Sequence, residues 1–149
     1  MRIQQLSQHE ADVLMKSLQE VYLKNWSEAF HEERNSPRTG AVALPAEKRT
    51  YFLVEAYLVG VFWGNITALT LSSFARVLAD HPAGSCAMCL KSLFETPLFP
   101  LCREQGKTQI VAKLEPGGVR VFKELQALMP GIALSRGFYW DALVPVPAS

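Results

Sequence analysis

The stretch that most constrains the fold is RTYFLVEAYLVGVFWGNITALTL, residues 49–71, because it holds only one charged side chain after its first residue. From Tyr51 to Leu71 it covers 21 residues, about the length that a helix needs to cross a bilayer. Two interpretations follow. The stretch either spans a membrane as a helix or forms buried strands of a soluble core.

The residue types in this stretch favour the strands. Glu55 lies about one turn inside the apolar run, where a carboxylate costs on the order of 2 kcal/mol or more in a membrane. The stretch is also rich in Tyr, Phe, Val, Trp and Thr, which suit pleated strands better than helices. We therefore expect a sheet core and no membrane partner.

Glycines inside the stretch indicate where these strands end or bend. Gly64-Asn65 is a dipeptide typical of turns. It separates an expected strand over 51–63 from a second one over 66–78. A further break or bulge is expected near Ala56 or Gly60.

The rest of the composition limits the classes of protein. A length of 149 residues suits a single domain, 1–149. With 15 Lys and Arg against 14 Asp and Glu, the net charge is +1, so no nucleic-acid partner is expected. Three cysteines without the spacing of a disulfide framework favour a reducing compartment. The first residues lack the continuous apolar segment of a secretory signal, so we expect cytoplasmic residence.

The region before the stretch predicts one helix and one irregular connection. Ser7 and Glu10 have the spacing of a capping box, which starts a helix. Residues 32–47 combine two prolines, a glycine and mixed charge, so we expect an irregular segment, either a lid or an ordinary loop. The apolar residues that would face the sheet recur at spacings of three and four: Ala11, Leu14, Met15, Leu18, Val21 and Tyr22.

After the second strand, a Pro-Gly loop leads into a helix that we expect to begin near Ser85. Amides at a helix start bind anions such as phosphate, and Gly84 would let a ligand approach the backbone. The alternative is an ordinary helix start capped by Ser85. Further along, Pro97 predicts a break near Thr96 and Gly106 a C-terminal stop.

The C-terminal third predicts a strand over 107–114, a helix over 119–129 and a last strand over about 138–144. The order of elements is helix, loop, strands, loop and helix, strand, helix, strand. This predicts an α+β fold in which helices flank one mostly antiparallel sheet.

Three segments resemble motifs of the GNAT superfamily of N-acetyltransferases. The pyrophosphate loop of that family resembles residues 81–86, HPAGSC. One of its strands resembles residues 57–64, YLVGVFWG. A helix end and the strand that follows it resemble residues 102–114, CREQGKTQIVAKL. The resemblance implies that this chain is a degenerate member of the family. It also implies an acetyl-CoA cofactor and direct acyl transfer to an amine-bearing acceptor. The cofactor-binding residues that it implies are Val77, Leu78, Gly84, Ser85, Cys86 and Ala87.

One departure from the family concerns proton transfer. Phe122 stands where the family often has a tyrosine that protonates the leaving thiolate. The resemblance then leaves Tyr139 as the acid, and Glu55 or His81 as the base. The alternative function is a non-enzymatic interaction or assembly module, such as a bacteriophage morphogenesis or virion protein. Its protein partner, or a second copy in a homo-oligomer, would contact Tyr139, Trp140 or the 32–47 loop.

Cys86 and Cys89 form a C-x-x-C pair at the expected helix start. Such a pair can be redox active, or it can supply half of a zinc site that Cys102 and His81 would complete. Cysteines three apart on an apolar helix face are more often small core residues. We therefore expect no metal.

Overall fold

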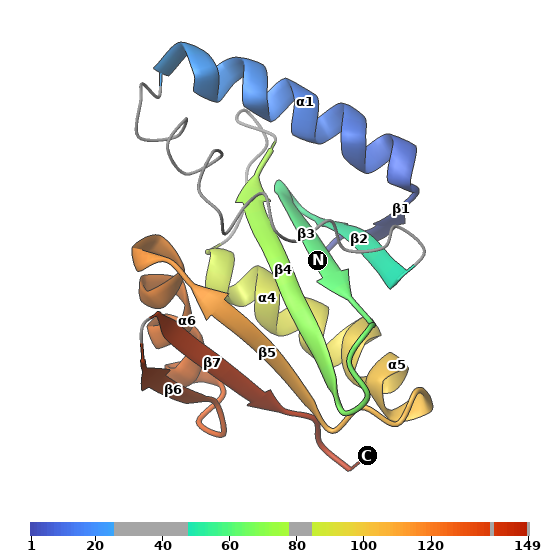
Figure 1. Cartoon of the computed structure of the whole chain (residues 1–149), viewed down its shortest axis with the longest axis vertical. Coiled ribbons are helices and arrows are strands. Elements are labelled where there is room, and N and C mark those ends of the chain that lie inside the picture. The colour runs from blue at the N-terminus through green and yellow to red at the C-terminus, as the bar shows by residue number, and fades with distance from the viewer. Residues whose placement is uncertain (26–47, 78–84, 138, 149) are drawn as a thin grey trace.

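The computed structural model describes residues 1–25, 48–77, 85–137 and 139–148. Within them, seven strands form one sheet in the order β1-β2-β3-β4-β5-β7-β6 (Figure 1). Neighbouring strands are antiparallel except β4 and β5, which run parallel. The strands are β1 Ile3–Leu6, β2 Arg49–Val54, β3 Tyr57–Phe62, β4 Ala68–Arg76, β5 Gln109–Leu114, β6 Ala133–Arg136 and β7 Trp140–Pro145.

Helices cover the two faces of this sheet unequally. α1 packs against one face beside β1 to β3, through a small cluster of Leu6, Ala11 and Leu58. The other helices lie on the opposite face, where they enclose the main core (Figure 1). The expected α+β fold, with a mostly antiparallel sheet flanked by helices, is therefore confirmed. The helices are α1 Gln8–Asn25, α4 Cys86–Leu93, the π-helix η2 Phe94–Leu98, α5 Phe99–Glu104 and α6 Pro116–Leu128.

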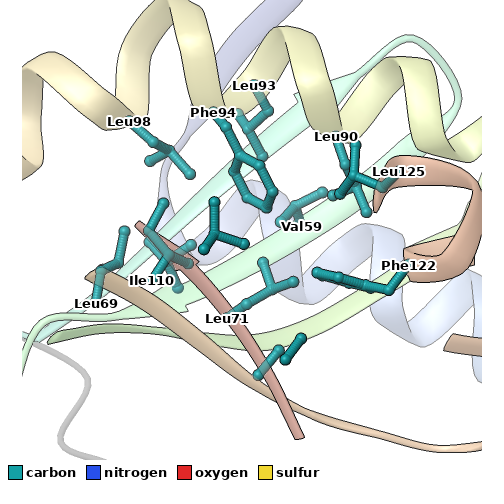
Figure 2. Close-up of a cluster of buried hydrophobic side chains, with 14 of the residues drawn as sticks. Val59, Leu69, Leu71, Leu90, Leu93, Phe94, Leu98, Ile110, Phe122 and Leu125 are labelled. Carbon is teal, nitrogen blue, oxygen red and sulfur yellow. The ribbon is translucent and has the colours of Figure 1, made fainter. Parts of the chain in front are cut away.

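The main core is apolar throughout. No polar or charged residue among the described ones is classed as buried. Figure 2 shows side chains from the helical layer meeting those of the central strands. They include Leu90 and Leu93 of α4, Phe94 and Leu98 of η2, Phe122 and Leu125 of α6, Val59 of β3, Leu69 and Leu71 of β4, and Ile110 of β5.

The apolar stretch 49–71 forms strands, as its composition predicts. The expected break near Ala56 is a turn at Glu55-Ala56 that divides the expected first strand into the β2–β3 hairpin. Glu55 adopts a positive φ of 52° at this turn. The loop 63–67, which includes Gly64-Asn65, then leads into β4. None of the helices formed by the described residues is both long and apolar enough to cross a membrane.

Two of the predicted helix signals, the capping box and the C-terminal stop, agree with the structure, but the break predicted near Thr96 does not. The Ser7 amide donates to Glu10 Oε1 at 3.0 Å, and the Glu10 amide donates to Ser7 Oγ at 3.1 Å, which is the predicted capping box. Pro97 lies in η2, where the helix widens instead of ending. Gly106 has a φ of 72° after α5, as expected of a C-terminal stop.

Two edge strands and one helix start differ from the expectation. β1 and β6 are four-residue strands at the two edges of the sheet, and neither was predicted. Short edge strands leave little sequence pattern, because much of their surface faces water. α6 begins at Pro116 rather than Val119, since proline is well tolerated in the first helical turn. Residues 32–47, which were predicted to form either a lid or an ordinary loop, lie outside the described residues.

Candidate functional site

The parallel strands β4 and β5 pair over only the first part of their length and then separate. The ladder between them runs from Ala68↔Gln109 to Leu71↔Ala112 and ends there. Figure 1 shows the two arrows beginning side by side and diverging toward their carboxyl ends. We call this region, residues 72–76 of β4 and 113–114 of β5, the β4–β5 divergence.

A bulge in β4 marks the point where the strands separate. Gly60 of β3 pairs with Ser73 and Val61 pairs with Leu71, so Ser72 is an extra residue in β4. A bulge of this kind bends its strand and increases the local twist. The bend directly follows Leu71, the last β4 residue of the ladder with β5, and so accounts for the divergence.

Gly60 leaves little room for a side chain beside this bulge. A Cβ at Gly60 would lie 2.9 Å from Ser73 Oγ and 3.1 Å from Ser72 Oγ. Those distances are too short for a side chain without a shift of the neighbours. The bulge expected near Gly60 is therefore confirmed, although the extra residue belongs to the facing strand.

Helix α6 closes the divergence on the helical side. The Phe74 ring of β4 lies 6.2 Å, centroid to centroid, from the Phe122 ring of α6. A Cβ on Gly118 would lie 3.5 Å from both Phe74 and Leu114, so the start of α6 lies close to both diverging strands. Figure 2 shows Phe122 pointing into the core, and it is 0% exposed. This position therefore presents an apolar ring and no proton donor.

The first turn of α4 lies beyond the end of β4, and its start is the one that the sequence predicts. Ser85 is the N-cap, and its Oγ accepts a hydrogen bond from the Met88 amide at 3.1 Å. The Cys89 amide donates to Ser85 O at 3.1 Å. The amides of Cys86 and Ala87 precede that bond, so they lie at the positive end of the helix.

The residues proposed to bind the cofactor differ in their surroundings. Ser85 is exposed, Cys86 is half-buried and Ala87 is buried. The Val77 amide donates to Ala56 O at 2.8 Å, and its side chain packs against the small cluster beneath α1, on the face opposite α4. The remaining residues of the predicted loop, Leu78, His81 and Gly84 among them, lie outside the described residues.

The two predicted catalytic residues lie at the same end of the sheet but beside different strands, Glu55 next to the end of β4 and Tyr139 next to the end of β5. Glu55, in the β2–β3 turn, accepts a hydrogen bond from the Arg2 amide at 2.7 Å and so links the N-terminal segment to the hairpin. Tyr139 precedes β7, whose first residue, Trp140, pairs with Leu114 at the carboxyl end of β5. Tyr139 therefore lies at the end of the sheet where β4 and β5 diverge. The catalytic roles of both residues stay predictions.

Tyr57 is a phenol near α4 that no sequence motif indicates as a site residue. It pairs with Arg76 across β3 and β4 and packs against the main core. Burial raises the pKa of the Tyr57 phenol, the nearby Cys86 raises it further, and Arg76 opposes both. A hydrogen-bonding phenol therefore stays protonated beside the open half of β4. The pairing register of β3 and β4 places Tyr57 beside Arg76, and the sequence alone does not show that register.

The cysteines behave as core residues. All three are free thiols, and Cys89 and Cys102 are buried. Burial raises the pKa of Cys86 to about 12 and that of Cys102 to about 11. Such thiols are poor nucleophiles at neutral pH. In the described part of the chain, no three His, Cys, Asp or Glu residues are grouped so that they could hold a metal ion.

Similar proteins were found by structure alone. No protein-family model matches the chain, and no curated protein matches it by sequence. The PaiA N-acetyltransferase from Thermoplasma acidophilum, in complex with coenzyme A, superposes with a TM-score of 0.55 at 10% identity, over 97% of this chain and 99% of that one.

Two further structures resemble the chain over nearly its whole length. The N-acetyltransferase PseH from Campylobacter jejuni, also solved with acetyl coenzyme A, superposes with a TM-score of 0.54 at 7% identity, over 98% of both chains. A probable acetyltransferase from Staphylococcus epidermidis gives 0.51 at 11% identity, over 99% of both. Identities this low establish the fold rather than an activity. The chain has the α+β fold of the GNAT N-acetyltransferases.

Proposed function

We propose that this protein binds acetyl coenzyme A in the β4–β5 divergence and transfers the acetyl group to an amine. The observation that carries the proposal is the end of the parallel ladder at the Ser72 bulge, with an exposed helix start beyond the same strand. Backbone groups of β4 that leave the ladder can bind an extended ligand. Two proteins of the same fold were solved with coenzyme A or its acetyl ester.

The helix start would hold the charged part of the cofactor. The amides of Cys86 and Ala87 point out of the positive end of α4, where a pyrophosphate is favoured. The neutral thiol of Cys86 adds no negative charge there, because its pKa is about 12. The amide-bearing arm of the cofactor would then follow Ser73 and Phe74 along the open edge of β4.

The proposed reaction is direct transfer. The amine nitrogen attacks the thioester carbonyl carbon, the carbon–sulfur bond breaks, a base takes the proton from nitrogen, and an acid protonates the thiolate. We keep Tyr139 as the proposed acid because it lies at the diverging end of the sheet. Glu55 stays the proposed base, although its bond to the Arg2 amide favours a structural role.

The test is a calorimetric titration with acetyl coenzyme A of the wild type, Ser85→Asn and Ser85→Asp. Both substitutions keep a good N-cap, so α4 should form in each. Only aspartate adds a negative charge at the proposed pyrophosphate position. We expect micromolar binding by the wild type and Ser85→Asn, and a loss of at least about 10-fold in Ser85→Asp, from the repulsion of a charge pair at close range. Equal binding by the two variants, or none by the folded wild type, would refute the proposed site.

Phe122 favours a second candidate, a module that binds without catalysing transfer. Its ring is fully buried against Phe74, so it supplies no proton where the GNAT family often has a tyrosine. Tyr139→Phe separates the two candidates in an acetyl-transfer assay with a panel of amines. A transferase that uses Tyr139 should lose kcat and keep its affinity for acetyl coenzyme A. A binding module should show no turnover in either protein.

A further inference from the structure

A second candidate binding site lies away from the β4–β5 divergence. A cavity of about 590 Å³ opens between the α4–η2–α5 segment and the turn that joins α6 to β6. This volume is within the range of small-molecule sites, about 300 to 1,000 Å³. The cavity is flanked by Val144 and Pro145 of β7, and Pro145 pairs with Gln109 at the amino end of β5. The divergence is at the carboxyl end of β5, on the order of 17 Å away along the strand.

The floor of the cavity is apolar. Phe99, Ile132 and Val144 line it and are at most 4% exposed. Leu128, at the end of α6, stays 42% exposed at its rim. A rim leucine above a buried apolar floor offers contact area to the apolar body of a ligand.

The charges at the rim are not balanced. Lys91 Nζ lies 2.5 Å from Glu95 Oε1, so these two charges compensate each other. Arg103 also lines the cavity, and its Nη1 donates to Pro147 O at 3.0 Å. That bond is to a neutral carbonyl, and among the described residues Arg103 has no carboxylate partner. A guanidinium carries five N–H donors, which leaves it able to bind a carboxylate.

We propose that this cavity binds a small amphipathic carboxylate, with its apolar body over Phe99, Ile132 and Val144 and its carboxylate on Arg103. The ligand class follows from the apolar floor and from Arg103, the one cation lining the cavity that has no carboxylate partner in the described part of the chain. The site is independent of the proposed acetyl coenzyme A site, because the two share no residue.

The test titrates the full chain with decanoate and, separately, with decanol, the neutral counterpart of nearly the same apolar length. Binding is followed by the methyl NMR signals of Ile132 and Val144. We expect both ligands to shift these signals and decanoate to bind more tightly. Arg103→Gln should weaken decanoate about 10-fold, as expected for one charge-assisted hydrogen bond, and leave decanol unchanged. Arg120→Gln, which removes an exposed cation of α6 outside the cavity, is the matched control and should change neither.

A second variant separates lost binding from lost structure. Leu128→Glu changes an exposed rim residue and should weaken both ligands, while the spectrum elsewhere and the binding of acetyl coenzyme A stay as in the wild type. Equal decanoate affinity in the wild type and Arg103→Gln would overturn the proposal. So would millimolar decanoate that leaves the Ile132 and Val144 signals unmoved.

Discussion

The first half of β4, residues 68–71, and its second half, residues 72–76, belong to one strand but have different neighbours. The first half lies between β3 and β5, and Ala68, Leu69 and Leu71 are at most 6% exposed. The second half pairs with β3 alone among the described strands, and Ser72 and Ser73 are exposed. One inserted residue therefore converts a core strand into the border of the proposed binding site.

The largest expected effect is a difference in the free energy of unfolding between substitutions in the first and second halves of β4. Leu69→Ala empties a fully buried position and should lower the free energy of unfolding by about 3 kcal/mol, within the usual range for such truncations. Ser73→Ala, in the open half, should change it by less than about 0.5 kcal/mol. Urea denaturation measures both. Similar losses in the two variants would mean that the halves are equally part of the core.

The next prediction tests the boundary between the two halves of β4, which is the bulge at Ser72 opposite Gly60. Gly60→Val places a side chain against Ser72 and Ser73 and should cost about 2 kcal/mol, as overpacking does. Gly117→Ala is the matched control, since a Cβ there meets nothing within 4 Å and alanine favours a helix. The control should be neutral or slightly stabilising in the same assay. A stable Gly60→Val protein would show that the bulge does not need a glycine opposite it.

A smaller effect concerns the helix start beyond the open half. Ser85→Ala removes the side chain that accepts from the Met88 amide and should cost about 1 kcal/mol. Ser85→Asn should cost less, because asparagine can replace the cap. Thermal unfolding followed by circular dichroism compares the three proteins. Equal midpoints would indicate that the cap contributes nothing to the folded state.

The last effect is a dependence on pH that is absent at neutral pH and appears only at high pH. Burial raises the pKa of the Cys86 thiol to about 12, above the ordinary thiol value of 9.0. A group with a raised folded pKa contributes its full stability below the unfolded pKa and loses it as the pH rises toward the folded one. The wild type should therefore lose stability between pH 9 and 12, and Cys86→Ala should lose less. Parallel curves for the two proteins, from urea unfolding at a series of pH values, would contradict this assignment.

The sequence predicted best what depends on local residue types. The capping box at Ser7 and Glu10, the cap at Ser85 and the stop at Gly106 each rest on the chemistry of one turn. Gly60 indicated a bulge because an isolated glycine inside a strand often marks one. The sheet could be expected from the β-branched and aromatic content of residues 49–71.

The features that the sequence missed depend on pairing between distant segments. Ser72 is the bulged residue only because Gly60 and Val61 pair with Ser73 and Leu71. Tyr57 lies beside Arg76 for the same reason, since register is a property of two strands together. The edge strands β1 and β6 have no strong alternation of their own and form where a neighbouring strand offers hydrogen bonds.

The most direct test of the account is a backbone amide NMR titration with acetyl coenzyme A. If acetyl coenzyme A binds in the β4–β5 divergence, the largest shifts should occur at Ser73, Phe74, Cys86 and Ala87, with little change at Ile110 in the closed part of the sheet. Shifts confined to other regions, such as the cavity around Ile132, would contradict the assignment of the β4–β5 divergence as the cofactor site.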